Sequence, residues 1–524
     1  MSQNCPLEDR LVSLQPEINN ATTTNEESSA MPLMANNRGF TLRQALKDLS
    51  FDSFPTFVFY LSNMLIWTFN LYYAGEHGDA ALTSAVGLTN TWMGATTFYI
   101  IYGLNIGTTA ICSQALGAGQ FRVAGLIFHR ALLMRIMIAV VLYPLQFFAG
   151  DMFNLFGVED QVAADAGIFC RYQIGVVFLI IIYDTLKSLL MANGIYTPFI
   201  FIQIIGIVAH WFLLLLFVDK LKFGVLGFCA AMTSTYLVLV VLLIGYILFA
   251  KPCKESLFFF RKDSYRGIFK QLKEELPIGA ILYLDFAAEQ MSVMLSGVYP
   301  SDQLAAQILN YNVISMMTLI PLGLNSTLTT YIGNAIGESN IIKLKRFIES
   351  GLILSGVLIL IECPILYFFC DKFAQIFTRD PSVLVLTKTL LEMYAFGAIA
   401  DFIQLVMSSI LRGIGKEKIA CLIFVAGNYM IGLPAGFVLG TILQGYTKGM
   451  FTGILMGMVF NAIATTIATV TVDLRRQSER ISLKIEKKLK LGILASSFAT
   501  VKSNQSILKS SMKSGADSQI EFNI

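Results

Sequence analysis

The chain has 524 residues, of which 55% are hydrophobic and only 14% are charged. A soluble globular protein carries about 25% charged residues, so this chain has too few to cover a water-facing surface. An ordinary cytosolic enzyme is therefore excluded. The content of 40 Gly and 13 Pro fits a polytopic helical membrane protein, whose spanning helices tolerate both residues. The net charge of +3 is small and no basic stripe with interleaved aromatic residues appears between the tails, which argues against nucleic-acid binding.

The two ends of the chain are more polar than its centre. Residues 1–48 are rich in Ser, Thr and Asn and lack the apolar run of a signal peptide, so we expect a disordered N-terminal tail. Residues 473–524 are polar and basic and predict a C-terminal tail. The first part of that tail has the composition either of a helix lying on anionic lipid or of a solvated segment.

Apolar runs fill the centre of the chain, and each is long enough to cross roughly 30 Å of hydrocarbon. We count twelve runs, centred near residues 63, 92, 137, 180, 207, 237, 287, 316, 359, 398, 430 and 460. They predict helices 1–6 in an N-terminal bundle over 49–250 and helices 7–12 in a C-terminal bundle over 276–472. A basic loop, 251–275, joins the two bundles.

The distribution of Lys and Arg predicts the orientation in the membrane. The connections after runs 2, 4, 6, 8 and 10, together with both tails, hold most of the basic residues. Cytoplasmic loops carry an excess of Lys and Arg, so these connections and both termini are expected to be cytoplasmic. Neither tail carries a motif that separates the plasma membrane from a vacuolar membrane or another endomembrane.

Short motifs recur along the chain at a shift of 220 residues. Gly103-Leu-Asn105 returns as Gly323-Leu-Asn325, and Ala115-Leu-Gly117 returns as Ala335-Ile-Gly337. Because each copy holds six helices, an even number, both copies begin on the same side of the membrane. This predicts a parallel repeat about an axis along the membrane normal. The predicted fold is therefore all-α and polytopic, with twelve transmembrane helices in two pseudo-symmetric six-helix bundles. Such a pair of bundles is typical of secondary transporters with a cavity between them.

Three acids at membrane depth are candidates for the transport chemistry, because ionisable groups there are costly and few. Asp285 and Glu289 are four residues apart and share one helix face, and Asp401 lies in the tenth run. Burial away from water disfavours the charged form of a carboxylate, so such groups take up and release protons near physiological pH. When charged they attract an organic cation.

Two further acids in the membrane favour structural roles. Asp184 has Lys187 one turn later, which predicts an intrahelical ion pair. Glu362 precedes Cys363-Pro364, where the proline frees backbone groups that seek polar partners.

Five motifs together resemble a known family. They are Leu276–Gly297 with Asp285 at its centre, the paired Cys112–Gln120 and Ile332–Gly337, Ser409–Gly415, and Gly427–Gly436. In this order, and over about 50–472, they resemble the eukaryotic type of the multidrug and toxic compound extrusion (MATE) family of cation-coupled antiporters. The resemblance implies the same twelve-helix fold.

The resemblance also implies where the coupling acids lie. The family's carboxylates in helices seven and ten match Asp285 and Asp401 here. Animal members carry a second acid five residues later in helix seven, where this chain has Gln290, with Glu289 one residue earlier. Helix one carries no acid, which argues against the bacterial pattern and favours a proton site in the C-terminal bundle.

Neutral polar and aromatic residues of the same helices are candidates to line the cavity. Aromatic faces attract cations, and the position of the family's helix-eight acid is occupied by an asparagine in this chain. The candidates are Tyr283, Gln290, Tyr311, Asn312 and Tyr429.

The sequence thus predicts a monomeric proton-coupled antiporter that exports organic, cationic small molecules by alternating access. No enzyme activity, cofactor or metal site is expected, because no nucleophile–base pair or metal-ligand cluster appears among the motifs. Two alternatives remain open: a sodium-coupled exporter, and a lipid-linked saccharide flippase of the same wider superfamily. The flippase would need basic cavity residues to hold phosphate, where this chain places acids.

Overall fold

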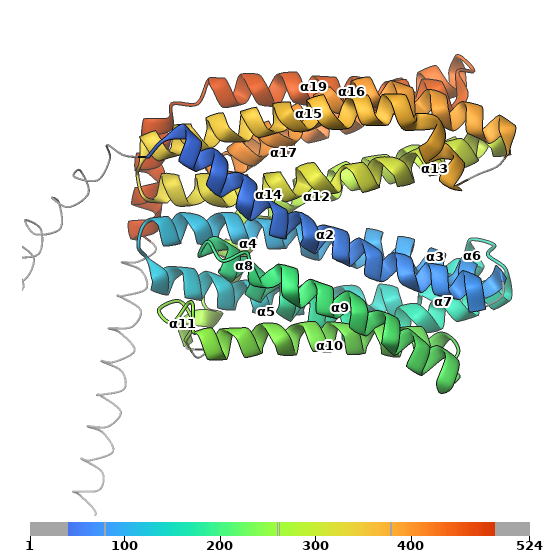
Figure 1. Ribbon diagram of the computed structural model, residues 1–524, viewed down its shortest axis with the longest axis horizontal. Helices are drawn as coiled ribbons and strands as arrows, with labels where there is room; N and C mark the ends of the chain where they lie inside the picture. Colours follow the sequence, from blue (N-terminus) through green and yellow to red (C-terminus); the bar gives the residue numbers. More distant parts are fainter. Residues whose placement is uncertain (1–39, 78–79, 259, 261, 378–379, 488–524) are drawn as a thin grey trace, which may run out of the picture.

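The computed structural model describes residues 40–77, 80–258, 260, 262–377 and 380–487. Within these ranges the chain forms helices and connecting turns, and no strand. Two helical bundles lie side by side with their helices roughly parallel, the N-terminal one in blue to green and the C-terminal one in yellow to red (Figure 1). The predicted all-α fold class is confirmed.

The N-terminal bundle contains six passes. The second pass is interrupted by a π-helical segment, η1, and the fifth ends in another, η2. A short helix, α6, leads from the third pass into the fourth, which is divided between α7 and α8. The elements are α2 (Leu42–His77), α3 (Ala80–Met93), η1 (Gly94–Phe98), α4 (Tyr99–Gly117), α5 (Phe121–Phe147), α6 (Ala149–Leu155), α7 (Asp160–Tyr172), α8 (Ile174–Ala192), α9 (Pro198–Leu214), η2 (Leu215–Lys220) and α10 (Val225–Ala250).

The C-terminal bundle contains six further passes. A one-turn helix, α11, precedes it, and its eleventh pass is the most irregular, since α17, η4, α18 and η5 follow one another in a single span. The elements are α11 (Lys262–Tyr265), α12 (Ile268–Leu295), η3 (Ser296–Val298), α13 (Ser301–Met317), α14 (Leu319–Gly337), α15 (Ile341–Phe377), α16 (Pro381–Gly413), α17 (Glu417–Val425), η4 (Ala426–Gly432), α18 (Leu433–Phe437), η5 (Val438–Ile442) and α19 (Tyr446–Val470).

The number of passes agrees with the twelve apolar runs. Nine helices in the described residues are long and apolar enough to cross a bilayer, and α13 with α14, bent by 43°, makes a tenth. The other two passes are α2, which carries several charged residues in its first turns, and α3 to α4, which is divided by η1. The bent or divided second and eighth passes occupy equivalent places in the two bundles.

The ends of α8 and α16 confirm the internal repeat. Gly194 and Gly415 each follow the helix with a positive φ, 76° and 74°, a conformation that glycine adopts at no steric cost. The amide of Gly194 donates to Met191, and that of Gly415 donates to Arg412, in the same capping pattern. Two helices far apart in the sequence therefore end in the same way.

The membrane bundles begin earlier than the sequence predicted. The tail 1–48 was expected to be disordered, but α2 begins at Leu42, because Ala45 and Leu49 are buried against the C-terminal bundle. Residues 1–39 of that tail lie outside the described residues. The basic loop 251–275 is likewise shorter than expected, since α12 starts at Ile268.

The start of α12 is helical because its polar residues find buried partners. Gln271 donates to the carbonyl of Ile127 on α5 at 2.9 Å and to the carboxylate of Glu275 at 2.7 Å. A sequence window that contains these polar residues is typical of a loop, although the amide of Gln271 has two acceptors inside the protein.

The C-terminal tail 473–524 also begins with a helix, over residues 474–487, and residues 488–524 lie outside the described residues. This helix runs across the ends of the spanning helices, at the same end of the molecule as the start of α2 (Figure 1). Gln477 donates to the carbonyl of Ile414 at 2.9 Å, and Ser478 donates to that of Ile336 at 3.3 Å. The segment is docked on protein here, so the expectation of a merely solvated tail is wrong for 474–487.

The two bundles meet closely where α4 and α14 end. The side-chain amide of Gln114 donates to the carbonyl of Gly413 at 3.0 Å, and that of Asn334 donates to the carbonyl of Ala192 at 3.2 Å. Each donor thus reaches the end of a helix in the opposite bundle. A Cβ atom on Gly337 would overlap the carbonyl oxygen of Gln114, so this approach needs glycine.

Gly337→Ala is therefore expected to lower the free energy of unfolding by about 1–3 kcal/mol, because the added methyl group has no space between the backbones. Thermal unfolding in detergent measures the change. Gly245→Ala on α10 is the control: no atom lies within 4 Å of its Cβ position, and alanine favours the helix. Equal melting temperatures for the two variants would contradict the close packing.

Candidate functional site

The strongest candidate site lies in the C-terminal bundle, on α12. Asp285 and Glu289 stand one turn apart and both line a narrow pocket, together with Asn428 of η4. Both carboxylates are partly buried. Phe286, beside Asp285, stacks on Tyr99 of α4 with ring centroids 3.5 Å apart, so the pocket adjoins the N-terminal bundle. The predicted shared face of Asp285 and Glu289 is confirmed.

An amide chain holds Asp285. Asn428 donates to the Asp285 carboxylate at 3.0 Å, and Asn461 of α19 donates to the side-chain oxygen of Asn428 at 2.9 Å. The π-helical turn of η4 places Asn428 toward α12. A Cβ atom on Gly427 would overlap the Asn461 amide, which explains why the residue before Asn428 is glycine.

Asp401 forms a second buried acid on α16, with 5% of its surface exposed. Tyr394 donates its hydroxyl to one carboxylate oxygen at 3.0 Å, and Gln404 donates its amide to the other at 2.8 Å. Both donors come from the same helix, one or two turns from Asp401. The carboxylate is therefore fixed by neutral groups rather than by a cation.

The three acids are close enough to repel one another. Asp285 interacts electrostatically with Asp401, and Glu289 interacts with both. Arg412, farther along α16, attracts Asp285 but donates its Nε hydrogen to the carbonyl of Ser408 at 3.3 Å. Like charges in a site protected from water repel one another, so the three carboxylates are electrostatically coupled.

The aromatic candidates lie around this cluster. Tyr429 donates its hydroxyl to the carbonyl of Leu284 at 2.9 Å and so ties η4 to α12 next to the acids. Tyr283 lies near Tyr429, and Tyr311 of α13 lies near Glu289. Tyr429 and Tyr311 are thus neighbours of the acids, whereas Tyr283 is a neighbour of Tyr429.

The two amide candidates differ in their placement. Gln290 lies beside Tyr311 at the edge of the cluster. Asn312 is exposed, and its amide donates to the carbonyl of Ile308 in its own helix at 3.0 Å. Asn312 is not among the residues that line the narrow pocket, and its place at the transport cavity stays a prediction.

The two remaining candidate acids do not line the pocket, although Glu362 interacts electrostatically with Asp401. Asp184 and Lys187 form the predicted ion pair, with 3.2 Å between Nζ and a carboxylate oxygen. Glu362 of α15 is buried, and its Oε2 atom has no hydrogen-bond partner in the described part of the chain. Its structural role stays a prediction.

Sequence reasoning missed the residues that hold the acids. Gln404 and Tyr394 are three and seven residues from Asp401, so helical spacing around a membrane acid is a signal that finds them. The contact between Asn428 and Asn461 joins two helices, so helical spacing does not reveal it. The one hint in the sequence is Gly427 next to Asn428 within an apolar run.

The described residues form twelve passes in two related bundles, with a partly buried acidic pocket, which is the architecture of secondary membrane transporters. The MatE family model matches the chain twice, over residues 55–216 and 277–438. The chain therefore belongs to the MATE family of multidrug and toxin efflux transporters, and its relatives are transporters rather than enzymes. The two matched segments fall in the two bundles.

Individual relatives agree with this assignment. The chain is 22% identical to Protein DETOXIFICATION 14 of Arabidopsis thaliana over 395 residues, which cover 75% of this chain and 81% of that protein. It is 23% identical to DETOXIFICATION 16 of the same plant, over 76% of this chain and 82% of that protein.

Solved structures share the fold. The eukaryotic MATE transporter AtDTX14 superposes with a TM-score of 0.81 at 20% identity, covering 85% of this chain and 99% of that chain. The Vibrio cholerae MATE transporter VcmN in its bent form gives 0.73 at 20% identity, covering 84% and 99%.

Asn461→Ala tests the amide chain of the site. It leaves the buried side-chain oxygen of Asn428 without its donor, which is expected to cost about 1–3 kcal/mol of folding stability. Asn312→Ala, which changes an exposed amide bonded only within its own helix, is expected to stay within about 0.5 kcal/mol of the parent. Thermal unfolding of both variants measures the difference, and a neutral Asn461→Ala would show that the chain does not hold the pocket.

Proposed function

We propose that the protein is an antiporter that exports organic cations in exchange for external or lumenal protons. The observation that supports this most directly is the cluster of Asp285, Glu289 and Asp401, whose hydrogen-bond donors are neutral amides and a hydroxyl. A cluster of acids without a bonded cation attracts either protons or a positively charged substrate. The two ligands then compete for the same carboxylates, which is the minimum requirement for exchange.

Asp285 is the principal carboxylate in this proposal. In its charged form it binds the substrate cation together with the ring faces of the neighbouring tyrosines. A proton from the outer side neutralises the carboxylate, and the cation loses its partner and leaves. When the site opens inward, the carboxylate releases the proton and becomes charged again. Asp401, held by Tyr394 and Gln404, tunes the charge of the same cavity.

The packing of the two bundles supports alternating access. Their substantial contacts involve α2, α4, α5 and α8 on one side and α12, α14, α15 and α16 on the other. Hydrogen bonds from Gln114 and Asn334 close the end where the described chain begins and ends. In the proposal this end is cytoplasmic, as the basic connections favour, and substrate release uses the opposite end.

Asp285→Asn is expected to reduce transport by at least roughly 30-fold, because loss of one partner of a buried charge pair costs about 2–5 kcal/mol. The measurement is uptake of an organic cation into proteoliposomes with an imposed pH gradient. Asp371→Asn is the matched control, since its carboxylate is 46% exposed and pairs with Lys388 at the surface, where such pairs contribute little. Full pH-driven transport by Asp285→Asn would remove this carboxylate from the mechanism.

Asp401→Asn is expected to reduce transport but to leave it above background, because Asp285 remains available for both proton and cation. The same uptake assay compares the two variants at equal protein density. Uptake driven equally well by a sodium gradient, without a pH gradient, would replace protons with sodium as the coupling ion.

A further inference from the structure

The N-terminal bundle contains a buried pair of opposite charges. Asp184 and Lys187 lie one turn apart on α8, and their side chains are 2% and 6% exposed. The Nζ atom of Lys187 is 3.2 Å from Oδ1 of Asp184. Burial of two charges is costly unless the geometry is good and further partners are present.

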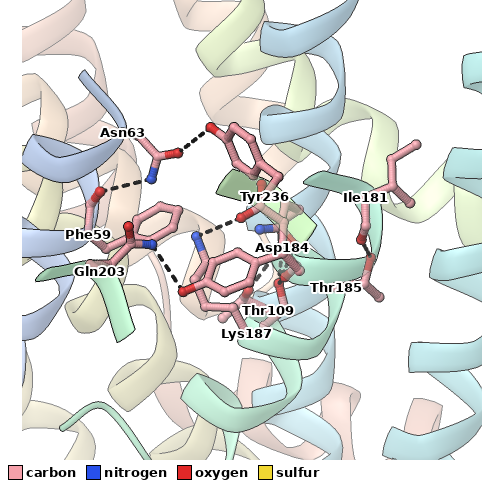
Figure 2. A network of polar contacts seen from close by, with 12 residues as sticks. Phe59, Asn63, Thr109, Ile181, Asp184, Thr185, Lys187, Gln203 and Tyr236 are labelled. Atoms are coloured by element: carbon pink, nitrogen blue, oxygen red, sulfur yellow. Dashed lines mark hydrogen bonds and ion pairs between the residues drawn. The ribbon is translucent and has the colours of Figure 1, made fainter. Parts of the chain in front are cut away.

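The further partners of Lys187 are aromatic rings of α2. Its Nζ atom lies 3.1 Å from the ring centroid of Phe59 and 5.7 Å from that of Tyr60. Figure 2 shows the ammonium group between the Phe59 ring and Asp184. A carboxylate combined with aromatic faces is a general way to bind an ammonium ion.

Asp184, Phe59 and Tyr60 surround the Lys187 ammonium group, and we call these three residues the cage. Hydrogen bonds connect the α2 side of the cage to another helix. Asn63 donates to the carbonyl of Phe59 at 2.9 Å and accepts from the hydroxyl of Tyr236 at 3.0 Å (Figure 2). Asn63 therefore ties the backbone of α2 at Phe59 to α10.

In the described part of the chain, Lys187 is the one cation that forms an ion pair with Asp184. Its second oxygen, Oδ2, is buried and has no hydrogen-bond partner among the described residues. Arg135 of α5 is buried nearby, but it donates to Thr185 at 2.7 Å, to the carbonyl of Leu104 at 2.9 Å and to Thr108 at 2.5 Å. Lys187 is thus the group that compensates Asp184 directly.

We propose that this cage is a binding site for a primary alkylammonium ion, and that the protein fills it with its own Lys187. The attached amine keeps external cations out of the N-terminal bundle. The acids of the C-terminal bundle differ, because their bonded partners are neutral. The inference concerns a binding site and its occupant, so it stands or falls independently of the proposed antiport.

The test supplies the missing amine to a variant that lacks it. Lys187→Ala removes the equivalent of n-propylammonium and leaves Asp184 buried and unpaired, which is expected to lower the melting temperature on the order of 10 °C. Incubation with n-propylammonium before heating is expected to restore most of the loss. The same concentration of tetramethylammonium, which has no N–H donor, is expected to have no effect.

Two controls define the site. Lys343→Ala removes an amine that pairs with Glu338 at 2.7 Å in a solvent-accessible place, and n-propylammonium is expected to leave its melting temperature unchanged. The double variant Asp184→Asn with Lys187→Ala has no buried charge at the cage and is expected to be more stable than Lys187→Ala and unresponsive to the amine.

Each outcome decides the proposal. The proposal is supported if folded Lys187→Ala protein can be purified only when n-propylammonium is present. It is also supported if the amine restores the melting temperature of this variant. An unchanged melting temperature with the amine overturns it, and so does an equal response of the double variant, which would place the amine elsewhere. The losses of stability in the single variants Lys187→Ala and Asp184→Asn are also compared with the loss in the double variant. If the loss in the double variant equals their sum, the two residues are not coupled and the proposal is overturned.

Discussion

A reciprocal pair of hydrogen bonds ties the two bundles together at one end. The last carbonyl groups of a helix have no partner within that helix. Here the ends of α8 and α16 receive side-chain amides from the opposite bundle: Asn334 bonds to Ala192, and Gln114 bonds to Gly413. The internal repeat produces both bonds, so each bundle completes a helix end of the other. Any separation of the bundles at this end must break both at once.

The two bundles use buried charge in different ways. In the N-terminal bundle Asp184 is compensated within one turn by Lys187, whose amine is covered by Phe59. In the C-terminal bundle Asp285 and Asp401 are bonded only by neutral donors in the described residues. The repeated scaffold thus holds one acid paired with a lysine in the N-terminal bundle. In the C-terminal bundle it holds a second set of acids bonded to neutral donors.

Much of the fold and part of the site could be predicted from the sequence. The lengths of the apolar runs determine the passes, and helical spacing places Glu289 beside Asp285 and Lys187 beside Asp184, because these relations are local. Contacts between helices could not be predicted in this way. Asn428 and Asn461 meet only because η4 widens into a π-helical turn, and composition does not reveal that geometry.

The polarity of short segments also led to wrong predictions of where helices begin and end. Residues around Gln271 and Gln477 are polar enough to be taken for a loop or a tail, yet both amides donate to carbonyls at the ends or sides of other helices.

The helix over 474–487 bonds to Ile414 and Ile336, and its Lys484 lies 3.5 Å from Glu274 at the start of α12. All three anchors belong to the C-terminal bundle, although the helix lies outside the membrane passes. These three contacts fix the position of the helix relative to the C-terminal bundle. A displacement of that bundle that preserves the contacts would carry the helix with it.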